Sequence, residues 1–108
     1  MEKARVHNVY VVELDKDVLK ERKFLEANSG HDPEKACLYV GMTGLSPDER
    51  FKNHKEGRKA NKYVKKYGLW LRRRIYTKYN PMTYEEAQRM EAWLARRLRA
   101  KGHAVWQN

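Results

Sequence analysis

LYVGMTGLSPDERFKNH, residues 38–54, predicts a strand, a glycine-containing turn and the first turns of a helix. The aromatic and branched residues at its start suit a pleated surface. Gly41 then allows backbone geometry that other residues resist. Ser46 and Glu49 form a capping-box pattern, and Pro47 suits the first position of the helix that follows.

Three polar side chains are expected to gather around this turn. Arg50 and His54 are four residues apart, so a helix places them on one face. Tyr39 lies near the end of the preceding strand. The three side chains suit a bound phosphate, because a guanidinium fork pairs well with phosphate oxygens.

The composition indicates one small domain, residues 1–108, with a heavily ionic surface. Hydrophobic residues make up 41% of the chain and charged residues 35%, enough for a modest core. There is no run of 18 apolar residues and no signal-peptide pattern at the start. The single cysteine, Cys37, excludes an internal disulfide and a cysteine-rich zinc site. We therefore expect a cytoplasmic protein that does not span a membrane.

The positive charge is concentrated in the second half of the chain. Residues 1–54 carry nine Lys and Arg against ten Asp and Glu, whereas residues 55–108 carry fifteen against four. A net charge of +10 with this asymmetry favours a polyanionic partner, and nucleic acid before a membrane surface.

The remaining pattern predicts a mixed α/β domain. The apolar run of residues 8–14 predicts a well-covered strand. The other expected elements follow in order: a helix from Asp15 or Asp17 to about residue 27, a strand 36–41, helices 47–56 and 60–67, a strand 69–76, a helix from Thr83 to about residue 100, and a short terminal strand at 105–106.

One carboxylate interrupts the apolar stripe of the longest expected helix. Ala87, Met90, Leu94 and Leu98 share one helical face, and Glu91 falls among them. An unpaired buried carboxylate is costly, so Glu91 needs a cation or strong donors. Two alternatives remain open: a structural ion pair with Arg or Lys, or a site for Mg²⁺ or Mn²⁺.

In order along the chain, these positions resemble the motifs of the GIY-YIG nuclease superfamily. The residues that carry the resemblance are Asn8-Val9-Tyr10, with Asn8 in place of the family's glycine, Tyr39-Val40-Gly41, Thr43, Arg50, His54, Glu91 and Asn108. The resemblance implies a small central, mainly antiparallel three-stranded sheet flanked by helices. Residues 15–35 are interpreted as a helical insertion, because the family has a short connection there.

The resemblance also implies metal-dependent hydrolysis of phosphodiester bonds in DNA. Glu91 would hold one divalent ion, Mg²⁺ or Mn²⁺, and Arg50 would clamp a phosphate oxygen. Tyr39, with Tyr10 beside it, or His54 would activate the water, and the sequence does not choose between them. Gly41, Thr43 and Asn108 would support the site.

The basic half of the chain is expected to hold the nucleic acid, DNA before RNA. The predicted contacts are Lys55, Arg58, Lys59, Lys62, Lys65, Lys66, Arg72 and Arg74, the last two along the strand 69–76. Such contacts give affinity without sequence preference. The alternative function is a nucleic-acid-binding module that keeps the fold but does not cut.

Overall fold

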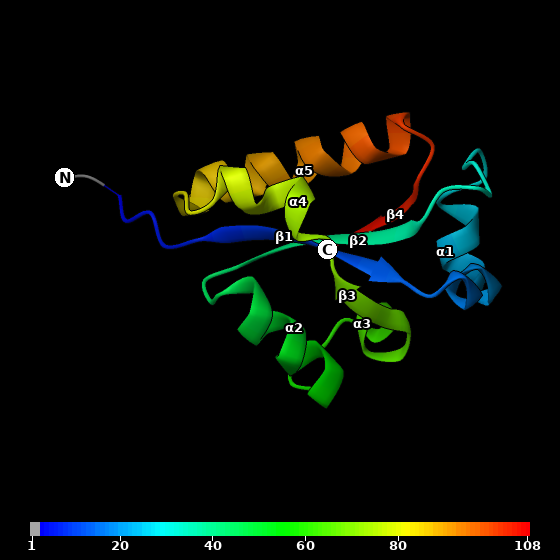
Figure 1. The fold of residues 1–108 in the computed structure, drawn as a ribbon, viewed down its shortest axis with the longest axis horizontal. Coiled ribbons are helices and arrows are strands. Elements are labelled where there is room, and N and C mark those ends of the chain that lie inside the picture. Colours follow the sequence, from blue (N-terminus) through cyan, green and yellow to red (C-terminus); the bar gives the residue numbers. More distant parts are fainter. Residues whose placement is uncertain (1–2) are drawn as a thin grey trace.

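A four-stranded mixed sheet divides the structure into two layers of helices (Figure 1). The structure is a computed structural model and describes residues 3–108. The strands are β1 (Asn8–Leu14), β2 (Cys37–Thr43), β3 (Gly68–Leu71) and β4 (Ala104–Gln107), in the order β3-β1-β2-β4. The expectation of an α+β architecture is confirmed.

The sheet has one more strand than the three expected. β1 pairs antiparallel with β2 along its whole length and with β3 at Val12–Leu14. β4 pairs parallel with Cys37–Val40 of β2. The antiparallel part is therefore the three strands β3, β1 and β2, and β4 makes the sheet mixed.

The helices form two layers, with α4 and α5 on one side of the sheet and α2 and α3 on the other (Figure 1). Within residues 3–108, no helix is long and apolar enough to cross a membrane. The helical elements are η1 (Lys16–Lys20), α1 (Arg22–Glu26), α2 (Pro47–Glu56), α3 (Lys62–Tyr67), α4 (Arg73–Tyr76), η2 (Thr77–Tyr79) and α5 (Tyr84–Ala100), where η marks a 3₁₀ helix.

Local capping signals explain the bounds of α2 and α5. The Ser46 hydroxyl accepts a hydrogen bond from the Glu49 N–H at the start of α2, which ends at Gly57 with φ of 84°. Thr83 and Glu86 form a reciprocal capping box at the start of α5. Both predicted helices are confirmed.

The predicted strand 69–76 is wrong after Leu71. The Arg72 N–H still bonds to the Val11 carbonyl at 2.8 Å, but α4 begins at the next residue. A continued strand would turn Arg73 toward the same covered face as Leu71 and Ile75. One helical turn instead leaves Arg73 and Arg74 exposed while Tyr76 is buried.

Residues 15–35 form two short helices instead of the single one expected, because Glu21 is extended between η1 and α1. The segment is part of the core. Phe24 is fully buried and stacks on Trp106 of β4, with ring centroids 6.2 Å apart. The Asn28 amide accepts a hydrogen bond from the Val105 N–H at 2.8 Å, which ties the segment to β4.

The side chain of Asn80 completes the pairing of β1 where β3 does not reach. Its Oδ1 accepts from the Val9 N–H at 2.9 Å, and its Nδ2 donates to the Val9 carbonyl at 2.8 Å. Val9 is fully buried. Without Asn80, both backbone groups would be buried without partners.

Asn80→Ala should therefore lower the free energy of unfolding by about 2–4 kcal/mol, because two buried polar groups lose their partners. Urea denaturation followed by circular dichroism measures this change. The control is Ser29→Ala, at an exposed turn position, which should stay within about 0.5 kcal/mol of wild type. Equal stabilities for the two variants would contradict the role given to Asn80.

Candidate active site

Tyr10, Tyr39 and His54 form a buried aromatic cluster on the face of the sheet that α2 covers. The β1–β2 register pairs Tyr10 with Gly41 and Val12 with Tyr39, so both phenols point to the same face. The ring centroids are 6.0 Å apart for Tyr10–Tyr39, 6.0 Å for Tyr10–His54 and 5.7 Å for Tyr39–His54. The structure therefore brings Tyr39 and His54 together, as expected from the sequence, with Tyr10 beside them.

Gly41 is required by the close approach of the two tyrosines. A Cβ at position 41 would lie 2.7 Å from Cζ and Oη of Tyr10 and 2.9 Å from Cε1 of Tyr39. The phenol rings therefore occupy the space that any side chain would fill.

His54 is held by hydrogen bonds at both ring nitrogens. Its Nδ1 lies 3.0 Å from the Asn61 backbone N–H, which can only donate, so Nδ1 accepts. The ring proton is then on Nε2, which donates to the Tyr10 hydroxyl at 2.8 Å. Burial lowers the pKa of His54 to about 4, and the positive charge of Arg50 acts in the same direction.

These hydrogen bonds hold the imidazole of His54 in one orientation. The imidazole is fully buried and neutral, and neither nitrogen is available to accept a proton from water. Because Tyr10 accepts the Nε2 proton, its own hydroxyl hydrogen is directed elsewhere. Tyr39 is also buried, with 1% of its surface exposed, so the two bases considered from the sequence differ in the hydrogen bonds of the imidazole and not in access to water.

The two phenols differ in how readily they lose a proton. The pKa of Tyr39 is raised to about 12, and burial is the largest cause. The charge of Glu91 also raises this pKa, whereas the hydrogen bond with Tyr10 and the charge of Arg50 lower it. Burial raises the pKa of Tyr10 still further, and the neighbouring Tyr39 adds to that effect. Tyr39 is therefore the more acidic phenol, and it is within electrostatic reach of both Arg50 and Glu91.

Arg50 lies half-buried one turn before His54 on α2. Its guanidinium donates to the carbonyl of Arg58 at 3.3 Å and to that of Lys59 at 2.9 Å, in the loop between α2 and α3. These two bonds orient the guanidinium, which also lowers the pKa of Tyr10 through its charge and a hydrogen bond.

Glu91 is buried in the apolar stripe of α5, as predicted, with 7% of its surface exposed. Its Oε1 accepts a hydrogen bond from Nε2 of Gln107 at 3.2 Å. No Lys, Arg or His lies within 4.0 Å of its oxygens among residues 3–108, so the alternative of a structural ion pair is not formed there. Burial raises the pKa of Glu91, and the bond from Gln107 opposes this shift.

Glu91 lines a cavity of about 490 Å³ at the edge of β2. β4 pairs with β2 only as far as Val40, so the last residues of β2 have no strand on that side. The other lining residues are His7, Met42, Thr43, Gly44, Tyr84, Gln88, Gln107 and Asn108. Thr43 and Asn108 therefore lie beside Glu91.

The five predicted catalytic residues thus form two neighbouring groups. Tyr10, Tyr39, Arg50 and His54 belong to the α2 side of the sheet, and none of them lines the Glu91 cavity. The link between the groups is electrostatic, through the effect of Glu91 on the pKa of Tyr39.

Asn8 and Thr43 shape the turn next to this edge. The Asn8 side chain donates to the Leu45 carbonyl at 2.9 Å, and the Thr43 hydroxyl accepts from the Leu45 N–H at 3.0 Å. Asn8, which stands where the GIY-YIG pattern has a glycine, therefore holds the loop that leads into α2.

Sequence reasoning missed three polar residues of the cavity. His7 packs edge-on against Tyr84, with ring centroids 5.3 Å apart, and its buried Nδ1 has no partner among the described residues. Gln88 lies one turn before Glu91, a spacing from which it could have been found. Gln107 becomes relevant only through the pairing of β4, which no local pattern indicates.

The donor set suits a hard divalent cation with few protein ligands. Residues 3–108 contain no group of three or more His, Cys, Asp and Glu side chains that could hold a metal. However, the uncompensated Glu91 carboxylate shares its cavity with the amides of Gln88 and Asn108 and the hydroxyl of Thr43. One carboxylate with oxygen donors, water and phosphate is an ordinary Mg²⁺ environment.

The predicted nucleic-acid contacts on α2 and α3 differ in whether their cationic groups already have a hydrogen-bond or ionic partner. Lys55 donates to the carbonyls of Lys65 and Gly68 and so ties α2 to α3. Arg58 pairs with Glu56 at 3.3 Å, and Lys66 with Glu21 at 3.6 Å. Within the described part of the chain, Lys59, Lys62 and Lys65 have no carboxylate within 4.0 Å.

The placement predicted for Arg72 and Arg74 is wrong, because neither continues a strand beside α3. Arg72 precedes α4 and pairs with Glu13 of β1 at 2.9 Å. Arg74 lies on α4, and both side chains line a cleft next to α5, on the opposite side of the sheet from α2 and α3.

Comparisons with known proteins assign no family: no family model, curated protein or solved structure matches the chain.

Gly41→Ala should lower the free energy of unfolding by about 1–3 kcal/mol, because the added methyl group forces the Tyr10 and Tyr39 rings apart. Gly30→Ala is the matched control, since nothing lies within 4 Å of a Cβ there. It should be neutral or slightly stabilising. Thermal unfolding measures the stability of both variants. An unchanged melting temperature for Gly41→Ala would exclude the close packing of Tyr10 and Tyr39 against Gly41.

His54 should make the protein less stable as the pH falls from 6.5 toward 4. The unfolded chain takes up a proton near pH 6.5, whereas the folded chain resists it until about pH 4. Acidification therefore favours unfolding, by roughly 3 kcal/mol over this range. Urea titrations at several pH values should show a shallower dependence for His54→Gln, and parallel profiles for the two proteins would refute the neutral histidine.

Proposed function

We propose that the chain is a metal-dependent endonuclease that hydrolyses phosphodiester bonds in DNA, as the resemblance to GIY-YIG nucleases implies. The observation that carries this proposal is the surroundings of Tyr39. This phenol lies in the buried cluster with Tyr10 and His54, two residues before the part of β2 that β4 leaves unpaired, and Glu91, a buried carboxylate without an ionic partner in residues 3–108, lines the cavity at that edge.

Hydrolysis requires a deprotonated water, and Tyr39 is the residue assigned to that step. An ordinary tyrosine has a pKa of about 10 and burial raises it, so positive charge must be close when the phenol takes up its catalytic role. Arg50 provides part of that charge. His54 and Tyr10 position the phenol, since the Nε2 proton orients the Tyr10 hydroxyl next to Tyr39.

Arg50 is assigned to the phosphate. Its bonds to the carbonyls of Arg58 and Lys59 hold the guanidinium in one orientation. The remaining N–H groups can then donate to a phosphate oxygen and stabilise the charge that develops on it.

Glu91 would hold one Mg²⁺ or Mn²⁺, together with oxygen donors of the cavity such as Thr43 and Asn108. When bound, such an ion supplies Lewis acidity at the scissile phosphate. The carboxylate is suited to this role because it is buried and its hydrogen-bond partner is the neutral Gln107.

The basic surface of α2 and α3 is assigned to the DNA backbone. Lys59, Lys62 and Lys65 are exposed in and just after the loop between α2 and α3, whose carbonyls hold Arg50. They have no acidic partner within the described residues. Contacts of this kind neutralise phosphates and give salt-dependent binding.

A non-catalytic nucleic-acid-binding module is the second candidate. The observation in its favour is that the Glu91 cavity and the tyrosine cluster are separate, since none of the other four predicted catalytic residues lines the cavity. A binding module would keep the basic surface but would not cut DNA in the presence of any divalent metal ion.

The test compares wild type, Glu91→Gln and Tyr39→Phe on supercoiled plasmid and branched DNA, with Mg²⁺ or Mn²⁺. Each variant should cut at least about 10²-fold more slowly, because each loses a group that acts on the reacting atoms. Chelation of the metal should abolish cutting by the wild type. Binding in EDTA should be unchanged.

Glu34→Gln is the control, because it removes an exposed carboxylate outside both groups. Wild-type rates for Glu91→Gln would remove Glu91 from the mechanism. Tight DNA binding by the wild type without nicking in either metal would favour the binding module.

A further inference from the structure

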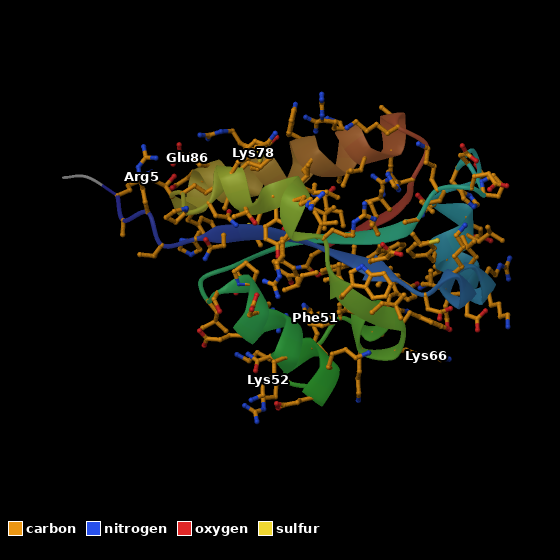
Figure 2. All side chains as sticks on the ribbon, viewed as in Figure 1. Arg5, Phe51, Lys52, Lys66, Lys78 and Glu86 are labelled. Carbon is orange, nitrogen blue, oxygen red and sulfur yellow. The ribbon has the colours of Figure 1, made fainter. Side chains whose placement is uncertain are left out.

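A cleft of about 300 Å³ lies between α4, η2 and α5, in the layer opposite α2 and α3. Five cationic side chains line it, and no acidic residue of the described chain does: Arg72, Arg74, Lys78, Arg97 and Lys101. Figure 2 shows Lys78 in the layer of α5, whereas Lys52 and Lys66 lie in the other layer. The cleft is therefore separate from the surface assigned to the substrate above.

Most of this charge has no counterion in the structure. Arg72 pairs with Glu13 at 2.9 Å. Arg74, Lys78, Arg97 and Lys101 have no carboxylate within 4.0 Å among residues 3–108. Like charges held together in this way repel one another, and a polyanion in the cleft would relieve that repulsion.

Aromatic rings lie beside the cations. Tyr79 lines the cleft and meets Trp93 edge-to-face, with ring centroids 6.0 Å apart. The Arg97 guanidinium lies over the Trp93 ring, 5.4 Å from its centroid, and Lys78 lies 5.3 Å from the centre of the Tyr79 ring. Trp93 is 38% exposed.

We propose that this cleft is a second nucleic-acid site, which binds an unpaired strand. Arg74, Lys78, Arg97 and Lys101 contact backbone phosphates. A base stacks on the Arg97–Trp93 pair, since both guanidinium planes and aromatic rings take up unpaired bases. Duplex DNA offers no free base face to this pair, so the site prefers a single strand.

This site does not depend on whether the chain cuts DNA. Its cations and rings come from the elements of one layer, and Tyr39, Arg50 and Glu91 do not line the cleft. A failed nuclease assay would leave the proposal intact, and a failed binding test here would leave the nuclease proposal intact.

The test measures the affinity of the full chain for a fluorescein-labelled single-stranded DNA by anisotropy, in EDTA and across a range of salt concentrations. Lys78→Gln with Arg97→Gln should weaken binding and reduce the slope of log Kd against log salt by about 1.4, because two phosphate contacts are lost. Lys23→Gln with Lys35→Gln removes the same charge from exposed positions elsewhere and should leave the slope unchanged.

Trp93 tests the stacking contact. Trp93→Ala should weaken binding of the single strand roughly five-fold or more, and Trp93→Phe should restore most of the affinity. On an abasic strand of the same length, wild type and Trp93→Ala should bind alike.

Three results would overturn the proposal. The first is an equal slope for the two double variants, which would mean that only net charge matters. The second is unchanged single-strand affinity for Trp93→Ala. The third is a loss of binding to anionic lipid vesicles, but not to DNA, in the Lys78→Gln and Arg97→Gln variant.

Discussion

The arrangement of the candidate site depends on one buried imidazole. His54 accepts from the Asn61 backbone and donates to Tyr10, so it joins α2, the loop before α3 and the central strand β1. Because both ring nitrogens are used, the ring has one orientation and one tautomer. This pair of bonds orients the Tyr10 phenol and holds α2, the helix that carries Arg50, against β1, while the strand register places Tyr39 and Gly41 beside them.

Local signals predicted the elements that carry the site, and non-local contacts account for what was missed. Pro47–Glu56 was predicted because Ser46 and Gly57 mark its ends within a few residues. The burial of Glu91 followed from helical spacing. The role of His54 stayed open, because it depends on a backbone N–H seven residues later that turns back in a loop. β3 ends at Leu71, just before Arg72, Arg73 and Arg74. This end depends on which conformation exposes the arginine side chains to water, and that is set by the neighbouring elements and not by the local sequence.

The layering of the fold explains why the predicted catalytic residues do not share one cavity. Alternation along β1 and β2 directs Tyr10 and Tyr39 toward α2, whereas Glu91 approaches the same edge from α5. A pattern in one sequence shows which residues share a face of their own element. It does not show which side of the sheet a helix covers. The side that each helix covers decides how the tyrosine cluster and the Glu91 cavity lie relative to each other.

The hydrogen bond from Val105 to Asn28 has a mechanical consequence. It anchors the parallel strand at its buried start, and the same strand carries Gln107, the partner of the Glu91 carboxylate. The segment 15–35 therefore helps to hold β4 on the first residues of β2, where the pairing ends at Val40. A change in residues 15–35 would therefore alter how much of β2 is paired with β4. It would also alter the position of Gln107 and thus the environment of the Glu91 carboxylate.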